Sequence, residues 1–451
     1  MNIFKKTFNV ILFVGMIVGA TFSTKAQNPI IQTYFTADPA PMVYDGTVYL
    51  YASHDEDTTV NNFFTMYDWR CYSSKDMVNW TDHGAVASLK DFDWMDKTNG
   101  AWAPQCIERN GEFYLYVPIH GEGIAVLVSD SPTGPFTDPI GKRLIDSDHI
   151  WQDIDPTVAI DDEGQAWLYW GNPSLWYVKL NEDMISYDRS IGDDGIVSVE
   201  MTTDAFGGAY TEGPWFYKRN DLYYMIYAAE GIPEYISYST ANSPDGPWTY
   251  RGHIMERADH LAFTNHAGII DFAGNSYIFY HDQALSNQGF KRSVSVEQFS
   301  YNEDGSIPLI TPTKEGVTKS VANLNPYQKV EAETIAWSEG LKTAGNSQEG
   351  VYVTKIDNDD YLKVRSVDFG DGAKSFEASV ASASEGGKIE IRLDNPEGEL
   401  IGTVDVNNTS GWQNWTTVKN KVKDTSGVHD ICFVFKGGAG KLFNFDWWRL
   451  N

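Results

Sequence analysis

Cysteine is scarce in this chain of 451 residues, which has only Cys71, Cys106 and Cys432. Three cysteines cannot form the several bridges that hold small secreted domains together, so a disulfide framework is excluded. Cys71 and Cys106 could still pair with each other, and free buried thiols are at least as well supported. Stability must therefore come from an apolar core, for which a hydrophobic content of 42% is sufficient.

Positive charge is also in short supply. Asp and Glu number 62 against 34 Lys and Arg, which gives a formal net charge of −28 at pH 7. A chain this acidic repels nucleic acid and anionic membrane surfaces, so both are excluded as partners. The balance suits a protein that acts on a neutral substrate, and we expect no organic cofactor.

Long apolar runs are absent after the N-terminal segment. In that part of the chain, no apolar run reaches the roughly 18 residues that a membrane span requires. Near the N-terminus, two lysines precede an apolar run from Val10 to Ala20, and small residues follow at Thr24 and Ala26. This is the pattern of a cleavable signal peptide, which we assign to residues 1–26. We therefore predict a secreted or periplasmic protein without a membrane anchor, and we expect a monomer.

Aromatic residues are abundant, at 14% of the chain, and many of them recur in a pattern. Five segments repeat the same mixture of apolar and aromatic residues, each directly after a turn rich in Gly, Asn or Asp; they are 48–51, 113–116, 166–169, 222–225 and 276–279. Hairpins that recur every 50–65 residues or so are typical of a radial array of sheets. We predict an all-β chain whose residues 28–320 form a five-bladed β-propeller.

One residue occupies the same place in each repeat, eleven or twelve positions before an aromatic strand centre: Asp38, Ala103 (beside Trp102), Asp155, Glu212 and His266. The inner strands of a propeller all start around one axis, so three carboxyl groups and an imidazole should meet in one pocket. Hydrolysis of a glycosidic bond needs one group to protonate the leaving oxygen and another to act at the anomeric carbon. The pattern thus predicts a carbohydrate-cleaving site.

The neighbours of the three acids favour this interpretation. Proline follows both Asp38 and Asp155 and restricts the backbone beside each acid. Glu212 is followed by Gly213, which allows close approach of a ligand, and by the apolar ring of Trp215. Partial desolvation and like-charged neighbours would raise the pKa of Glu212, as a general acid requires.

These motifs resemble those of glycoside hydrolase family 43; they are Ala37-Asp38-Pro39, Trp102-Ala103-Pro104, Ile154-Asp155-Pro156, Glu212-Gly213-Pro214, Asn265-His266 and Lys291-Arg292-Ser293-Val294. The resemblance implies a five-bladed propeller and an inverting mechanism. In that mechanism Asp38 is the base that activates water, Glu212 is the general acid, and Asp155 orients Glu212 and raises its pKa. Arg292 would bind sugar hydroxyls or the catalytic carboxylate, and Trp102 would form a wall of the innermost subsite.

The resemblance also implies that His266 faces an ion on the propeller axis, usually calcium, held largely by water. A purely hydrogen-bonding role for His266 is the alternative. We interpret His281 and Asp282 as structural residues and 161–163 as a hairpin turn. Residues 58–69 form a long loop whose aromatic rings either line outer subsites or pack on each other.

From Tyr327 the sequence changes to cleanly alternating strands separated by Gly and Asn turns, which predicts a β-sandwich (jelly-roll) domain over residues 327–451. Its motifs at 330–333, 367–370, 411–415 and 444–447 resemble carbohydrate-binding module family 6. The resemblance implies a sugar-binding cleft between the rings of Tyr352 and Trp412, in which Asn444 bonds hydroxyl groups and Tyr361 adds a wall. We expect Trp415 to be part of the core.

The same resemblance implies a structural calcium ion held by Glu331, Glu333 and Asp446, because hard oxygen ligands suit calcium. Surface charge is the alternative explanation for these three acids.

The expected activity is that of a secreted inverting glycoside hydrolase acting on plant cell-wall hemicellulose, an α-L-arabinofuranosidase that removes arabinose from arabinoxylan. β-Xylosidase or an arabinan-degrading activity of the same family is the alternative, with xylan or arabinan as substrate. Two other classes remain open: a non-catalytic glycan-binding propeller, and a retaining enzyme acting on fructans. The latter carries Asn-Asp-Pro where this chain has Ala37-Asp38-Pro39.

Overall fold

The described part of the chain is almost entirely β-structure. The computed structural model describes residues 27–149, 151–258, 261–346 and 350–451, so the signal peptide assigned to residues 1–26 lies outside it. Within these ranges the helical elements are the short turns η1 (Leu89–Asp91) and α1 (Thr203–Phe206). No helix there is long and apolar enough to cross a membrane. The prediction of an all-β chain is confirmed.

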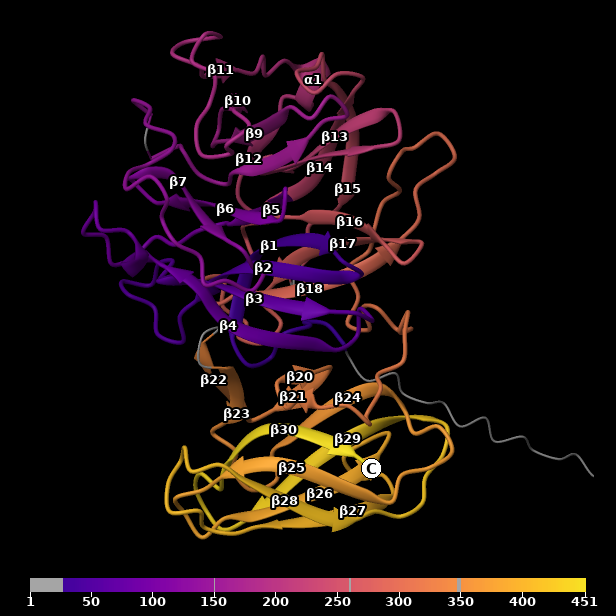
Figure 1. The fold of residues 1–451 in the computed structure, drawn as a ribbon. Helices are drawn as coiled ribbons and strands as arrows, with labels where there is room; N and C mark the ends of the chain where they lie inside the picture. The colour runs from indigo at the N-terminus through magenta and orange to yellow at the C-terminus, as the bar shows by residue number, and fades with distance from the viewer. Residues whose placement is uncertain (1–26, 150, 259–260, 347–349) are drawn as a thin grey trace, which may run out of the picture.

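Five antiparallel sheets follow one another along residues 35–299 (Figure 1). The first contains β1 (Phe35–Tyr44), β2 (Thr47–Asp55), β3 (Asp68–Ser74) and β4 (Trp80–Ser88), and the second contains β5 (Gln105–Arg109), β6 (Glu112–Ile119) and β7 (Gly123–Ser129). The third contains β8 (Thr157–Ile160), β9 (Ala166–Trp170), β10 (Trp176–Leu180) and β11 (Val197–Ser198). The fourth contains β12 (Tyr210–Arg219), β13 (Leu222–Ala229), β14 (Tyr235–Ala241) and β15 (Thr249–Met255), and the fifth contains β16 (Gly268–Phe272), β17 (Asn275–Asp282) and β18 (Ser293–Phe299).

Tight turns explain why the first two strands of each sheet form hairpins. Asp45 and Gly46 between β1 and β2 have φ values of 43° and 68°, and Asn110 and Gly111 between β5 and β6 have values of 57° and 84°. Two consecutive residues with positive φ match the twist of the flanking strands, and Asp-Gly and Asn-Gly are the pairs that adopt this conformation most readily.

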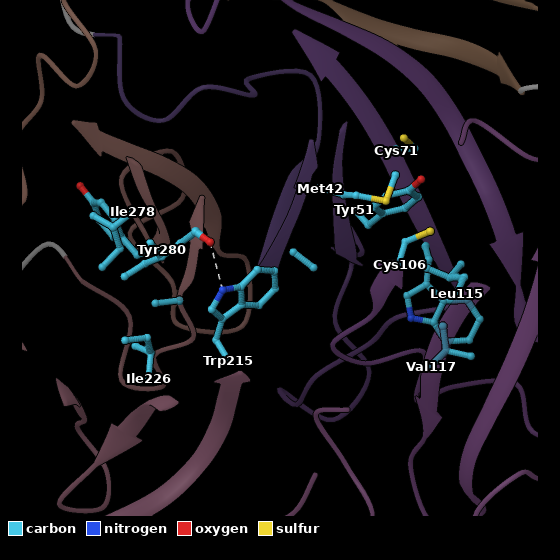
Figure 2. Packing of buried hydrophobic residues seen from close by; sticks show 14 of the residues in the cluster. Met42, Tyr51, Cys71, Cys106, Leu115, Val117, Trp215, Ile226, Ile278 and Tyr280 are labelled. Atoms are coloured by element: carbon cyan, nitrogen blue, oxygen red, sulfur yellow. Dashed lines mark hydrogen bonds between the residues drawn. The ribbon is translucent and has the colours of Figure 1, made fainter. Parts of the chain in front are cut away.

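The first strands of the five sheets are neighbours in a ring. β1 lies against both β5 and β16. The side chain of Gln105 on β5 bonds the backbone of Val158 on β8, and Thr157 on β8 accepts a hydrogen bond from the backbone of Phe216 on β12. The ring closes where the indole of Trp215 on β12 donates to the carbonyl of Ile269 on β16 at 3.1 Å (Figure 2). The starts of these strands therefore face one shared space.

A large apolar core surrounds this ring. Buried residues of the first, second, fourth and fifth sheets form one continuous cluster, which includes Trp215, Leu115, Ile226 and Ile278 (Figure 2). Cys71, Cys106 and Cys432 are all buried, and Cys71 and Cys106 do not form a bridge. Burial raises the pKa of the Cys106 thiol to about 12, which leaves it protonated and unreactive.

Two further sheets make up the C-terminal part of the chain. One contains β19 (Val330–Glu331), β22 (Lys342–Asn346), β23 (Gly350–Thr354), β30 (Asn444–Leu450), β25 (Ser375–Ala381) and β28 (Thr416–Lys421). The other contains β21 (Trp337–Glu339), β24 (Tyr361–Asp368), β29 (Val428–Gly437), β26 (Gly387–Leu393) and β27 (Leu400–Val406). Phe376 on β25 and Trp448 on β30 contact Phe433 on β29 of the other C-terminal sheet. Their ring centroids lie 5.4 and 5.1 Å, respectively, from that of Phe433. The apolar faces of the two sheets thus share one core.

A short strand joins the two parts of the molecule. β20 (Thr334–Ile335) pairs with β4, so the C-terminal part supplies a fifth strand to the first sheet (Figure 1). Thr343 adds two more links, since its hydroxyl donates to Asp82 at 2.5 Å and its carbonyl accepts from Tyr34 at 2.6 Å. Backbone pairing and buried polar contacts, rather than a free linker, hold the parts together.

Candidate active site

Asp38 sits at an irregularity in the innermost strand of the first sheet. The pairing of β1 with β2 shifts register between Ala37 and Ala40, and Asp38 has a φ of 51°. Positive φ is uncommon for residues other than glycine and persists only where the surroundings enforce it. The bulge directs the carboxyl group of Asp38 out of the regular ladder and into the space at the start of the ring.

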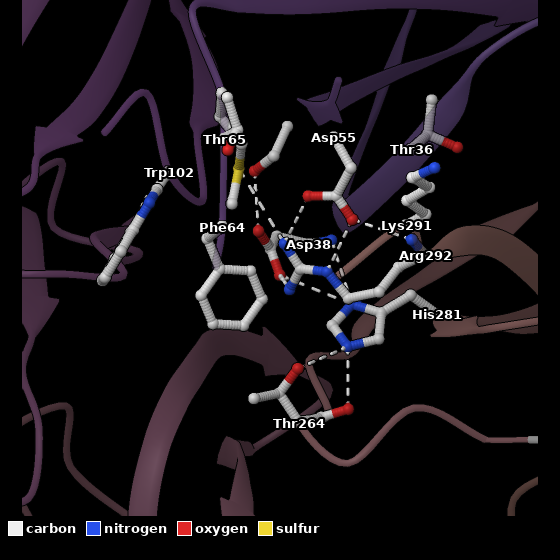
Figure 3. A network of polar contacts seen from close by, with 12 residues as sticks. Thr36, Asp38, Asp55, Phe64, Thr65, Trp102, Thr264, His281, Lys291 and Arg292 are labelled. Atoms are coloured by element: carbon white, nitrogen blue, oxygen red, sulfur yellow. Dashed lines mark hydrogen bonds and ion pairs between the residues drawn. The ribbon is translucent and has the colours of Figure 1, made fainter. Parts of the chain in front are cut away.

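The carboxylate of Asp38 is held by an arginine and a serine (Figure 3). Its Oδ1 accepts from Nη1 of Arg292 at 3.0 Å, and its Oδ2 accepts from the hydroxyl of Ser53 at 2.6 Å. Arg292 is itself clamped by Asp55, which accepts from Nε and Nη2 at 2.9 Å each. Burial would raise the pKa of Asp38, but the Arg292 guanidinium lowers it well below its usual value. Asp38 is therefore an ionised carboxylate that can accept a proton.

His281 also contacts Asp38, although the sequence favoured a purely structural role. The backbone N–H of Asp38 donates to Nδ1 of His281 at 3.1 Å. Nδ1 is therefore the accepting nitrogen and Nε2 carries the proton, which it donates to the carbonyl of Thr264 at 2.9 Å. The fully buried imidazole thus fixes the backbone at Asp38.

Asp155 is the second buried acid, and it controls the backbone beside the third. It too has a positive φ, 57°, and its Oδ2 accepts from the backbone N–H of Gly213 at 2.9 Å. Burial, followed by the nearby charges of Glu212 and Asp38, raises the pKa of Asp155 well above its usual value. The three acids predicted from the sequence therefore lie close enough for their charges to interact.

Glu212 lies where the pairing of β12 with β13 shifts register on both sides of it. Its Oε2 accepts from the side-chain amide of Asn172 at 2.5 Å. Burial raises the pKa of Glu212, the bond from Asn172 opposes the rise, and the charge of Asp38 adds to it. Glu212 consequently keeps its proton to a higher pH than an ordinary glutamate does.

Aromatic rings wall the space beside these acids. Trp102 is partly buried and stacks on the imidazole of His120, with ring centroids 3.9 Å apart. Phe64, from the loop between β2 and β3, lies 5.9 Å from the ring of Trp102 and 4.7 Å from the guanidinium carbon of Arg292 (Figure 3). It also contacts Phe290, so this loop both packs on neighbouring rings and lines the site.

His266 is buried next to Gly213. A Cβ atom on Gly213 would lie 3.2 Å from Nδ1 of His266, and Gly213 has a φ of 60°, so only glycine fits there. Burial lowers the pKa of His266 to about 4 even though Asp38 favours the charged form. His266 is thus a neutral imidazole. In the described chain, the three-residue cluster with metal-ligand spacing is His54, Glu56 and Asp68, which does not include it.

The two rings expected to flank the C-terminal cleft, Tyr352 and Trp412, each contact a neighbouring side chain. Tyr352 packs edge-on against Trp415 at 5.3 Å, and its hydroxyl accepts from Gln413 at 2.6 Å. Trp415 is 36% exposed, so the expectation that it belongs to the core is wrong. The strand position that would have buried it lies outside β28, which begins only at Thr416. Trp412 is partly exposed, with the ammonium of Lys441 4.2 Å from its ring centroid.

The two other residues expected in that cleft are occupied within the fold. Asn444 is 1% exposed; its amide donates to the carbonyl of Trp412 at 2.6 Å and accepts from Thr354 at 2.8 Å. Tyr361 belongs to the opposite sheet, is buried, and donates to Glu339 at 2.8 Å. Neither side chain is presented to solvent as a binding group.

Glu331, Glu333 and Asp446 line one cavity at the junction of the two parts of the molecule. Oε2 of Glu333 is buried and accepts no hydrogen bond from the described protein atoms. Burial and the charges of Glu331, Asp82 and Asp446 raise the pKa of Glu333 well above its usual value. An unpartnered buried carboxylate oxygen in a cavity lined by other acids suits a hard cation such as calcium, although these three acids are not the cluster with metal-ligand spacing among the described residues.

Several residues of the site escaped the sequence analysis. Ser53 and Asp55 carried a usable signal, because they are two apart on β2 and therefore share one face of the strand. Asn172 and Glu234 come from irregular segments between strands, and nothing in a local pattern marks them.

In this site Asp38 is kept ionised and Glu212 retains its proton, and aromatic rings line the space beside these two acids. This combination defines an enzyme that hydrolyses glycosidic bonds with a carboxylate base and a carboxylic acid. The chain belongs to the glycosyl hydrolases of family 43: residues 26–307 match the family described as Glycosyl hydrolases family 43. Residues 331–451 match Carbohydrate binding module (family 6).

Known proteins resemble the chain over both parts. An arabinoxylan arabinofuranohydrolase of Bacillus subtilis (strain 168) is 37% identical, over 94% of this chain and 92% of its own. A crystal structure of a family 43 arabinoxylan arabinofuranohydrolase from Bacillus subtilis, in complex with cellotetraose, superposes with a TM-score of 0.82 at 35% identity and covers 94% of this chain and 97% of that one. A β-xylosidase/α-arabinofuranosidase from a compost metagenome, solved with xylotriose in a calcium-free form, has a TM-score of 0.56 at 30% identity and covers 63% of this chain and 97% of that one.

Replacing Arg292 by Met should shift the pH dependence of catalysis. The substitution removes the cation that favours the ionised form of Asp38, and burial then acts alone to raise its pKa. Because the base must be ionised, the acid-side midpoint of kcat/KM should move to higher pH by about one to three units. The measurement is a pH profile on an aryl glycoside. Arg219→Met, which breaks the exposed pair with Asp271, is the control; an unmoved midpoint in Arg292→Met would contradict this account.

Proposed function

We propose that the protein is an inverting α-L-arabinofuranosidase that removes arabinose side chains from arabinoxylan. The observation that carries the proposal is likeness along the whole chain: the arabinoxylan arabinofuranohydrolases match both parts in the same order, over 94% of this protein. Relatives with other names either match a smaller share, as does the β-xylosidase/α-arabinofuranosidase at 63%, or are less similar, as is a xylosidase/arabinosidase of Thermoclostridium stercorarium that is 24% identical over 93% of this chain.

The architecture we propose follows from the sheets. The five sheets whose first strands form a ring are the blades of a five-bladed propeller over residues 28–320. The two sheets that share the C-terminal core form a β-sandwich of the jelly-roll type over residues 327–451. Residues 1–26 are the signal peptide of a secreted or periplasmic monomer.

In the proposed reaction, Asp38 accepts a proton from a water molecule whose oxygen attacks the anomeric carbon. Glu212 gives its proton to the leaving oxygen as the glycosidic bond breaks on the opposite face of the ring, which inverts the configuration. Asp155 orients Glu212 by accepting a hydrogen bond from the backbone N–H of the adjoining Gly213. Trp102 and Phe64 exclude water beside the sugar.

Arg292 had two alternative roles, and its contacts favour one of them. Its hydrogen bonds to carboxylates go to Asp38 and Asp55, so we assign it to holding the base ionised and oriented rather than to binding sugar hydroxyls. His266 remains a candidate for contact with substrate in the innermost subsite. A neutral imidazole is a weak ligand for calcium, so the axial calcium stays a prediction.

β-Xylosidase is the second candidate, favoured by the xylotriose bound to a solved relative that carries both activities in its name. Initial rates on an aryl arabinofuranoside, an aryl xyloside, linear arabinan and arabinoxylan separate the candidates. The proposal requires arabinose to be the product released from arabinoxylan. Xylose as the main product would assign the β-xylosidase activity instead. If none of the substrates yields a product, the remaining interpretation is a non-catalytic glycan-binding propeller.

Glu212→Gln and Asp38→Asn should each lower kcat on arabinoxylan by at least about a thousandfold, because each removes one of the two proton transfers. Circular dichroism should show an unchanged fold. Proton NMR of the first-formed sugar should show the β-anomer of arabinose, the product of inversion. A first-formed α-anomer would point instead to the retaining mechanism considered for fructan enzymes, and parental turnover by either variant would refute the assignment of roles.

We further propose that the C-terminal part binds sugar through exposed rings, Trp412 and the adjoining pair of Tyr352 and Trp415. Asn444 contributes indirectly, since it holds the backbone of Trp412. Trp412→Ala should weaken binding to insoluble xylan several-fold in a pull-down assay, while turnover of a soluble aryl glycoside changes by less than about twofold. Val428→Ala, another exposed apolar position, should bind like the parent. Equal binding by all three proteins would exclude this cleft.

Calcium is the proposed structural ion, held by Glu331, Glu333 and Asp446, and it would relieve the repulsion among these carboxylates. Removal of calcium with a chelator should lower the Tm, and added calcium should restore it, because an ion that binds only the folded state stabilises that state. Glu333→Gln should abolish the calcium-dependent rise in Tm, and the exposed Glu397→Gln should preserve it. If the Tm of the parent protein does not depend on calcium, these acids do not form a calcium site, and the alternative explanation as surface charge holds.

A further inference from the structure

A fourth acid, Glu234, lies beside the proposed catalytic pair and is not used in the mechanism above. It directly precedes β14 and is 2% exposed. Its backbone N–H donates to the carbonyl of Phe263 at 3.1 Å, and its Oε2 accepts from the backbone N–H of Asn265 at 2.5 Å. Glu234 is thus fastened at both ends to the segment that leads into β16, which gives its carboxyl group a fixed position.

The other oxygen of Glu234 points to a specific partner. Oε1 is buried and has no hydrogen bond with any described amide, hydroxyl or ammonium group. The carboxyl group of Glu212 lies within hydrogen-bonding reach of the carboxyl group of Glu234. Two carboxyl groups attract each other only when at least one of them holds a proton, since two carboxylates would repel. The contact therefore requires a proton on the pair.

The surroundings keep a proton on Glu234 in addition to the one on Glu212. Burial, followed by the charges of Glu212 and Asp155, raises the pKa of Glu234 well above its usual value, and only the N–H of Asn265 opposes the rise appreciably. The pKa of Glu212 is also raised by burial, but bonds from Asn172 and from Glu234 oppose this. Other ionisable groups also face the pair: Asp38, Arg292 and Tyr210 beside Glu212, and Arg257 in the cavity that borders Glu234.

We propose that Glu234 is a positioning residue for the reaction proposed above: its neutral carboxyl group donates a hydrogen bond to Glu212 and, with Asn172, fixes the acid for proton transfer. The inference rests on the proposed function. In the reacting step, the proton of Glu212 passes to the leaving oxygen, which also takes the electron pair of the breaking C–O bond. Glu212 becomes a carboxylate, while Glu234 keeps its own proton throughout.

The hydrogen bond from Glu234 strengthens as this charge develops. A donor of fixed position in a buried site stabilises a forming carboxylate more than it stabilises the neutral acid, so it lowers the barrier rather than only tightening substrate binding. A residue that merely filled space would not distinguish between substrates that need the proton and substrates that do not.

The test compares two substitutions of Glu234 on two arabinosides. Glu234→Gln keeps a hydrogen-bond donor of the same shape, and Glu234→Met keeps the length without a donor. On arabinoxylan, whose leaving sugar must be protonated, Glu234→Met should lower kcat about 10- to 100-fold with KM changed less than about threefold. On 4-nitrophenyl arabinofuranoside, whose leaving group departs with little protonation, the loss should be less than about fivefold. Glu234→Gln should stay within about threefold of the parent on both.

Glu230→Met is the matched control, because Glu230 is an exposed acid in the same connection whose carboxylate pairs with His253 at the surface. It should match the parent on both substrates, and the Tm of each variant shows whether it folds. Three results would overturn the inference. Glu234→Met could lose equal activity on the two substrates, or it could keep the activity of the parent. Glu234→Gln could also be as impaired as Glu234→Met.

The proposed function itself is checked in the same experiment by Glu212→Gln. If the parent cleaves the arabinosides and Glu212→Gln loses activity, failure of the Glu234 variants to behave as described overturns the inference alone. If the parent cleaves neither substrate, or if Glu212→Gln remains active, the proposed function fails and the inference fails with it.

Discussion

A single guanidinium group serves a site that contains five carboxyl groups. Arg292 is bonded to Asp38 and Asp55, which leaves Asp155, Glu212 and Glu234 without a cation of their own among the described side chains. Burying an unpaired negative charge is costly, so groups without a partner take up protons instead. The difference between a base and an acid in this site thus arises from one arginine placed on one side of it.

Backbone irregularities make this distribution of charge possible. Asp38 and Asp155 both have positive φ, and Glu212 lies between two shifts in strand register. Each device turns a side chain from the ladder toward the shared space. The strain is opposed by specific hydrogen bonds, such as those that the backbone N–H of Asp38 donates to His281 and the backbone N–H of Gly213 donates to Asp155. The rigid ring of inner strands, closed by Trp215, supports these conformations.

The C-terminal part is coupled to the five sheets of residues 35–299 more closely than a tethered module would be. Strand β20 extends the first sheet, the same sheet that carries Asp38, and Thr343 reaches the buried pair of Arg70 and Asp82. The acids proposed to hold calcium lie at this junction. Sugar bound by the exposed rings would therefore lie at a fixed distance from the catalytic acids instead of exploring a wide volume.

By itself, the sequence determined the all-β class and the three acids, because strand alternation, turn residues and a repeat of fixed length are local signals that survive in one dimension. It also pointed to Trp102 and Arg292. Only the tertiary structure decided that Asp38 is ionised, that His281 fixes its backbone, that Glu234 meets Glu212, that Trp415 is exposed and that Asn444 and Tyr361 are enclosed. These properties depend on groups brought together from distant segments, and pKa, burial and hydrogen bonding are set by such neighbours rather than by adjacent residues.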